Sequence, residues 1–87
     1  MSKLEKTLRR ILAATADKNI SFGEPCRLLH ELGFTERVRG SHHIFARQGV
    51  DEIVNLQPLR GEAKPYQVRQ VRELILRYRL GGGHHAE

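Results

Sequence analysis

The spacing of apolar side chains changes at Phe34, and this change constrains the fold more than any other feature of the sequence. Before Phe34, apolar residues recur every three or four positions, as on one face of a helix. From Phe34 to about residue 56 they alternate with polar residues, as in a strand. Helical spacing returns after Pro65. This order predicts that helices come before and after a central sheet along the chain.

Two helices are predicted before the sheet. The first covers residues 3–16 and ends in the polar run 16–19. The second follows Ser21, which stands three residues before Glu24 in the spacing of a capping box, and it has Pro25 in its first turn. Gly33 is placed to end it. The inward-facing positions are Leu4, Leu8, Ile11, Leu12 and Thr15 in the first helix and Cys26, Leu28, Leu29 and Leu32 in the second.

Three strands follow, at residues 34–39, 41–47 and 53–56. Gly40 separates the first two, and Gln48 with Gly49 is a hairpin-turn signal before the third. A loop of residues 57–64 leads to a last helix, which begins at Pro65 and ends at the glycines 81–83. The inward-facing positions of this helix are Val68, Val71, Leu74, Ile75 and Tyr78, with Arg69, Glu73 and Arg77 opposite them.

These elements predict an α+β fold with the order α-α-β-β-β-α. Three antiparallel strands with helices on one face form a two-layer sandwich, which leaves the other face of the sheet partly open. A chain of 87 residues leaves little room for a second core, so we expect a single domain over residues 1–87.

Positive charge is concentrated in the second half of the chain. The formal net charge is +5, and residues 37–79 carry nine Lys/Arg against four Asp/Glu. Eleven of the fifteen basic residues are Arg, whose planar guanidinium suits phosphate. This balance favours binding to a polyanion such as RNA. The alternative is a charged surface that contacts only solvent.

Cysteine usage and hydropathy indicate a cytoplasmic protein. Cys26 is the only cysteine, so an intrachain disulfide is impossible and a reducing compartment fits best. We find no apolar run long enough to cross a bilayer and no apolar segment of a signal peptide, and no membrane partner is expected. Cys26 stands among leucines and is interpreted as a core thiol rather than a nucleophile.

The segment RGSHHIF, residues 39–45, places two adjacent histidines in the second strand. Successive side chains of a strand point to opposite faces, so His42 lies with Ile44 and His43 with Phe45. The pattern alone does not say which histidine is exposed. Because the two point apart, they cannot easily chelate one ion, and the chain has no CxxC, HxH or HExxH spacing. We therefore expect no metal and no cofactor.

A histidine beside a phosphodiester can carry the proton in RNA cleavage. RNA supplies its own nucleophile, the ribose 2′-OH, so a base, an acid and cations for the developing phosphorane charge are sufficient. Gly40 lets the backbone approach a phosphate, and Ser41 offers a hydroxyl. The candidate cations are Arg37, Arg39, Arg47 and Lys64. The competing interpretation is a histidine that only packs or hydrogen-bonds.

The segments Leu32-Gly33-Phe34 and Gly40-Ser41-His42-His43-Ile44-Phe45 resemble the HicA family of toxins from bacterial toxin–antitoxin pairs. The resembling region is about residues 22–79, to which a helix at 3–16 and a flexible tail at 81–87 are added. The resemblance implies a fold like a double-stranded-RNA-binding domain and a metal-independent ribonuclease that acts on mRNA. It also implies that the catalytic histidine directly follows Gly-Ser, which is His42, and that a HicB-like antitoxin covers the basic sheet face.

Two other interpretations remain open. The first is a non-catalytic RNA-binding module of the same fold, which needs the basic residues but not the histidine. The second is a protein-interaction domain that docks a partner through its first or last helix. The second interpretation predicts no RNA affinity even at low salt, where phosphate contacts are strongest.

Overall fold

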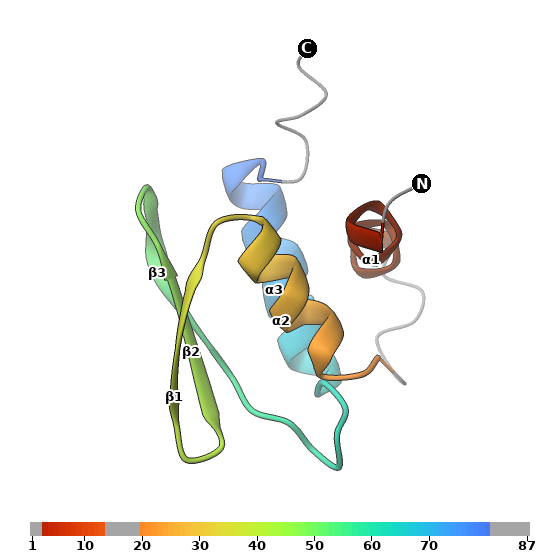
Figure 1. Cartoon of the computed structure of the whole chain (residues 1–87). Coiled ribbons are helices and arrows are strands. Elements are labelled where there is room, and N and C mark those ends of the chain that lie inside the picture. The colour runs from red at the N-terminus through yellow and green to blue at the C-terminus, as the bar shows by residue number, and fades with distance from the viewer. Residues whose placement is uncertain (1–2, 14–19, 81–87) are drawn as a thin grey trace.

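A computed structural model describes residues 3–13 and 20–80, with side chains from residue 6 onward. Two predicted features lie outside the described residues: the end of the first helix at 16–19, and the glycines 81–83 with the tail that follows them. The order α-α-β-β-β-α is confirmed (Figure 1). The elements are α1 (Lys3–Ala13), α2 (Gly23–Glu31), β1 (Thr35–Arg39), β2 (His42–Arg47), β3 (Val50–Leu56) and α3 (Pro65–Tyr78).

Helix α2 begins and ends close to the predicted signals, with one difference at its start. The Glu24 carboxylate accepts the Ser21 N–H at 3.2 Å, as in a capping box, but the Glu24 N–H donates to the Ser21 carbonyl at 3.0 Å. The N-cap residue is therefore Phe22 rather than Ser21. At the other end Gly33 has φ 95°, and the N–H groups of Gly33 and Phe34 donate to the carbonyls of His30 and Leu29. This is a Schellman motif, which ends the helix as predicted.

The three strands form one antiparallel sheet in the order β1-β2-β3. Gly40 has φ 61° in the turn between β1 and β2, and this turn pairs Arg39 with His42. Strand β3 begins at Val50, three residues earlier than predicted, because Val50 already pairs with Arg47 across the hairpin. The sequence-based start relied on an apolar run, whereas pairing in a hairpin begins at the turn.

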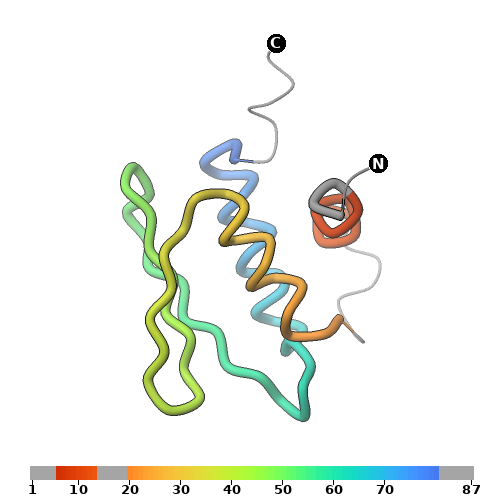
Figure 2. Tube along the Cα trace, in the orientation of Figure 1, coloured from red at the N-terminus to blue at the C-terminus, as the bar shows by residue number. Residues whose placement is uncertain are grey.

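Helices α2 and α3 cover one face of the sheet, and α1 packs against α2 and α3 on their far side (Figures 1 and 2). The helices therefore form two levels: α2 and α3 lie against the sheet, and α1 lies outside them. The other sheet face carries no helix in these views. None of the helices within the described ranges is long and apolar enough to cross a membrane.

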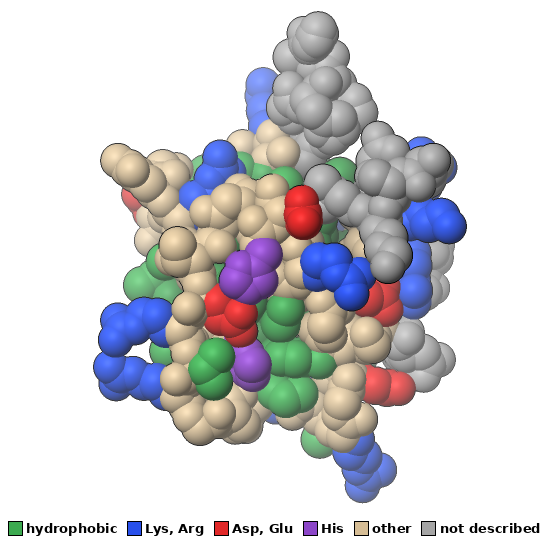
Figure 3. All heavy atoms as spheres, viewed as in Figure 1, with side chains coloured by type: hydrophobic (Ala, Val, Ile, Leu, Met, Phe, Trp, Pro, Cys, Tyr) green, Lys and Arg blue, Asp and Glu red, His purple; other side chains and the backbone are tan. Residues whose placement is uncertain are grey.

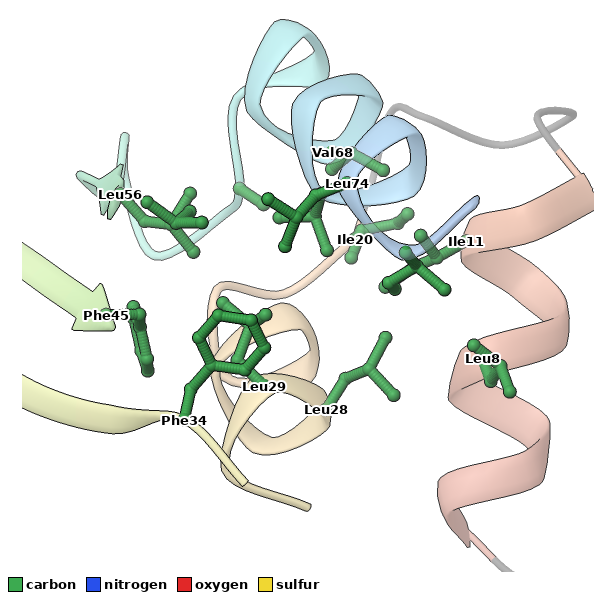
Figure 4. Close-up of a cluster of buried hydrophobic side chains, with 14 residues drawn as sticks. Leu8, Ile11, Ile20, Leu28, Leu29, Phe34, Phe45, Leu56, Val68 and Leu74 are labelled. Atoms are coloured by element: carbon green, nitrogen blue, oxygen red, sulfur yellow. The ribbon is translucent and has the colours of Figure 1, made fainter. Parts of the chain in front are cut away.

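One core cluster joins side chains from the sheet and all three helices (Figure 4). Phe45 and Leu56 contribute from the sheet, Leu28 from α2, and Val68 from α3. Ile11 of α1 has no exposed surface, so α1 belongs to the same core. The segment around Ile20 is held in place by the loop before α3, since the Ala63 N–H donates to the Ile20 carbonyl at 2.8 Å and the Phe22 N–H to the Gly61 carbonyl at 3.0 Å.

Candidate active site

The two histidines of RGSHHIF lie on opposite faces of the sheet. Phe45, which shares a face with His43, is fully buried under the helices. The His43 ring packs edge-on against the Phe22 ring, with centroids 4.8 Å apart. His42 is exposed on the open face. The structure therefore answers the question that strand alternation left open, and only His42 is available to a large substrate on the open face.

His42 is oriented by a residue of the neighbouring strand. Its Nδ1 lies 3.2 Å from Oδ1 of Asn55, which is exposed on β3. An amide oxygen accepts a hydrogen bond, so Nδ1 carries the proton in this contact and Nε2 of the neutral ring is left as an acceptor. Sequence reasoning did not select Asn55, because the register between β2 and β3 was needed to bring it beside His42.

The turn before His42 contains Gly40 and Ser41. A Cβ on Gly40 would meet nothing within 4 Å, so the turn lies open to solvent. The Ser41 hydroxyl oxygen accepts a hydrogen bond from Nε2 of Gln57 at 3.0 Å, which leaves its own hydrogen free to donate. Gln57 was also missed from the sequence, since it belongs to the loop that follows β3.

Two of the four candidate cations lie around His42. Arg39 pairs with His42 across the β1–β2 ladder, and Arg37 follows it on the same face two residues away. Both arginines are exposed. The group that the structure brings together is therefore Gly40, Ser41, His42, Arg37 and Arg39.

The other two cations lie elsewhere. Arg47 is at the opposite end of β2 from His42, and its half-buried side chain lies against the backbone of Gly33, on the helix side. Lys64 is the N-cap residue of α3, and its Nζ lies 5.9 Å from the centroid of the Tyr66 ring. The loop before α3 and the β1–β2 turn lie at the same end of the molecule (Figure 1). The structure does not bring Arg47 to His42.

A second cluster of ionisable side chains lies on the helix side of the sheet. The Glu36 carboxylate contacts Nε2 of His30 at 2.6 Å with one oxygen and Nδ1 of His43 at 2.5 Å with the other. These hydrogen bonds, the one with His43 first, lower the pKa of Glu36 below its usual value. Burial, and then the nearby Glu36 carboxylate, raises the pKa of the Cys26 thiol to about 12. On the face of the molecule shown in Figure 3, two histidine side chains lie on either side of an acidic one.

The second cluster was not predicted from the sequence, because its four residues come from three different elements. A usable signal was present: Cys26 and His30 are four residues apart in a helix, which places them on one face. The role that this cluster gives His43 is structural, since its Nδ1 contacts Glu36 and its ring packs edge-on against the Phe22 ring.

A comparison with protein-family models matches residues 24–77 to the family described as HicA toxin of bacterial toxin-antitoxin. The match covers more than half of the chain, from the first turn of α2 to the last turn of α3, and includes the turn and His42. Helix α1 lies before it. No curated protein and no solved structure matches the chain.

Proposed function

Since this chain belongs to the HicA family of bacterial toxin–antitoxin toxins, we propose that it is an endoribonuclease that cleaves mRNA with His42 as its acid/base group. The observation that carries this proposal is the position of His42. Its side chain is exposed on the open sheet face opposite Arg39, and its Nδ1 contacts Oδ1 of Asn55. A flat open face admits a polymer, which an enclosed pocket would not.

In the proposed reaction, Nε2 of His42 accepts the proton of a ribose 2′-OH as the oxygen attacks the adjacent phosphorus. The bond from phosphorus to the 5′-oxygen breaks and leaves a 2′,3′-cyclic phosphate. The 5′-oxygen takes a proton from the protonated His42 or from water and becomes a 5′-hydroxyl. The Asn55 contact holds the ring in the required tautomer. No metal takes part in these steps, so we expect cleavage to persist in EDTA.

The groups around His42 supply charge and position. Arg39, directly opposite His42, and Arg37 stabilise the negative charge that builds on the phosphorane. The Ser41 hydroxyl and the backbone at Gly40 contact a non-bridging oxygen or the next phosphate. Lys64, at the N-cap of α3, extends the contact along the RNA. The prediction that Arg47 contacts RNA also stays open. Such a contact would lie at the other end of β2 from His42, away from the bond that breaks.

We further propose that a HicB-like antitoxin neutralises the toxin by covering the open sheet face. Acidic groups on that partner would pair with Arg37 and Arg39, and its bulk would block His42. The cytoplasm, where mRNA is translated, is the expected site of action.

The test is cleavage of a labelled mRNA in EDTA by the wild type and by His42→Ala, each first shown to be folded by circular dichroism. Loss of one acid/base group lowers such rates by about 10²–10⁴-fold. We expect cutting by the wild type only, and no cutting of RNA that carries 2′-deoxyribose at the scissile position. Equal cutting by both proteins would exclude His42 as the catalytic group.

A non-catalytic RNA-binding module is the second candidate. It is favoured by the exposed Arg37 and Arg39, which bind phosphate without any histidine. Salt-dependent RNA binding by the wild type, with no cleavage and no effect of His42→Ala, would support it.

A further inference from the structure

Four potential metal ligands converge where α2 packs on β1 and β2. Cys26 and His30 come from one face of α2, and Glu36 and His43 come from the helix side of the sheet. The ligand atoms of Cys26, Glu36 and His43 all lie within 4.8 Å of one another. His30 joins them through its 2.6 Å contact with the Glu36 carboxylate.

The cluster lies between two aromatic rings. Phe22 stands edge-on to His43, and Phe45 stands edge-on to His30 with centroids 5.5 Å apart. The side chains of Glu36 and His43 are 19% and 25% exposed, whereas the side chain of His30 is 49% exposed. Solvent therefore reaches the cluster mainly from the His30 side, which would provide an entry path for an ion.

We propose that Cys26, His30, Glu36 and His43 bind a zinc-class divalent cation that fastens α2 to the sheet. One thiolate, two imidazoles and one carboxylate are the ligand types that Zn²⁺ takes, in tetrahedral geometry. With bonds of about 2.0–2.3 Å, ligand atoms around tetrahedral zinc stand roughly 3.3–3.8 Å apart. For Cys26, Glu36 and His43, whose ligand atoms lie within 4.8 Å of one another, side-chain rotations that close this separation by about 1 Å give tetrahedral spacing. His30, which already contacts Glu36, is the fourth ligand.

Charge balance favours a dication in this cluster. A deprotonated Cys26 and Glu36 together carry two negative charges, which a Zn²⁺ ion neutralises while both imidazoles stay neutral. Without the ion, the raised pKa of Cys26 keeps the thiol protonated at neutral pH. Binding therefore replaces the thiol proton with the metal and releases that proton, so the affinity should increase with pH.

The proposed site lies on the opposite sheet face from His42, so it stands independently of the proposed ribonuclease function. Its effect is on stability, because an ion that binds the folded state alone raises the unfolding temperature. The EDTA cleavage assay above is accordingly run at a temperature where the metal-free protein remains folded.

Cobalt is the probe, because Co²⁺ occupies zinc sites and absorbs light when a thiolate binds it. The protein is the untagged full-length chain with His84→Ala and His85→Ala, which removes two competing histidines. We expect one equivalent of Co²⁺ to produce a thiolate-to-cobalt charge-transfer band that Zn²⁺ abolishes. Because Cys26 is the only cysteine, this band reports on that residue alone.

Two variants of this parent chain locate the site. Cys26→Ser should remove the band and weaken Zn²⁺ binding at least about tenfold. His42→Ala, the neighbour of His43 on the opposite face, should retain both the band and the affinity. Absence of the band in the parent, or equal Zn²⁺ affinity in the parent and in Cys26→Ser, would overturn the proposal. The parent measurement decides the question even if Cys26→Ser does not fold, since it requires no substitution in the cluster.

Discussion

His42 and His43 are adjacent in the chain, yet their side chains have different surroundings and, in our proposal, different roles. His42 is exposed beside Asn55 and Arg39, where a proton can be exchanged with a substrate. His43 is held by Glu36 and Phe22 under the helices. The two residues are therefore matched controls for each other.

Substitution of His43 should affect stability more than substitution of His42. His43→Ala removes a hydrogen bond to a carboxylate and an aromatic contact, and we expect the free energy of unfolding to decrease by about 1–3 kcal/mol. His42→Ala should change it by less than about 0.5 kcal/mol. Urea denaturation in EDTA measures both, and equal losses would argue against the structural role of His43.

Glu36 should make stability depend on acid pH. Its pKa is lowered in the folded protein by the hydrogen bonds with His43 and His30, whereas the unfolded value is about 4.5. The stability that Glu36 contributes is therefore fully present above about pH 4.5 and is lost as the pH falls through the lowered folded pKa. Unfolding free energy measured from about pH 6 to pH 3 should show this loss. Glu36→Gln should flatten the profile, and an unchanged profile would contradict the assignment.

At the scale of single elements, helix α2 begins at Gly23 and is followed by Gly33, and these two glycines have opposite requirements. Gly33 needs φ 95° to close the Schellman motif, whereas Gly23 begins the helix and has open space around its Cα. Gly33→Ala should destabilise the protein by about 1 kcal/mol or more, because an L-residue is strained at that φ. Gly23→Ala should stabilise it by about 0.4–1 kcal/mol. Thermal unfolding distinguishes the two, and effects of the same sign would contradict the expectation.

Helix α1 precedes the region that matches the family model, but it packs as part of the core. Ile11 is fully buried, Arg10 pairs with Glu24 of α2 at 3.1 Å, and Arg72 of α3 donates to the Ile11 carbonyl at 3.1 Å. An appended helix would not show contacts of this kind with both neighbouring helices.

Truncation of Ile11 tests this integration. Ile11→Ala should lower the free energy of unfolding by about 2–5 kcal/mol through lost burial and the cavity left behind. Leu76→Ala on α3 is the control, since Leu76 is 60% exposed and its loss should cost less than about 0.5 kcal/mol. Chemical denaturation provides both values. A small effect of Ile11→Ala would mean that α1 is dispensable for the fold.

At the scale of the whole molecule, the exposed arginines of β1 give the open sheet face a positive charge, while the core lies on the other side. RNA affinity should therefore depend on Arg37 and Arg39 in particular. With His42→Ala as a non-cleaving background, alanine at either arginine should reduce the slope of log affinity against log salt by about one. Arg27→Ala on the exposed side of α2 is the matched control and should leave the slope unchanged. If all three alanine variants reduced the slope equally, the open sheet face would not be the specific binding site for RNA.

The sequence by itself determined the order of the elements, the turn at Gly40 and the separation of His42 from His43. These features follow from local geometry: the period of a helix, the period of a strand and the conformational freedom of glycine. The family resemblance seen in the sequence also selected His42, and the structure places this residue on the exposed face.

Tertiary structure decided what surrounds these residues. Strand register brought Asn55 to His42, and the loop after β3 brought Gln57 to Ser41. Helix packing placed Cys26 and His30 against Glu36 and His43, and it turned Arg47 away from the site. Side-chain spacing along one helix or strand cannot predict such contacts. They depend on which helix and sheet faces pack against each other when the hydrophobic core forms.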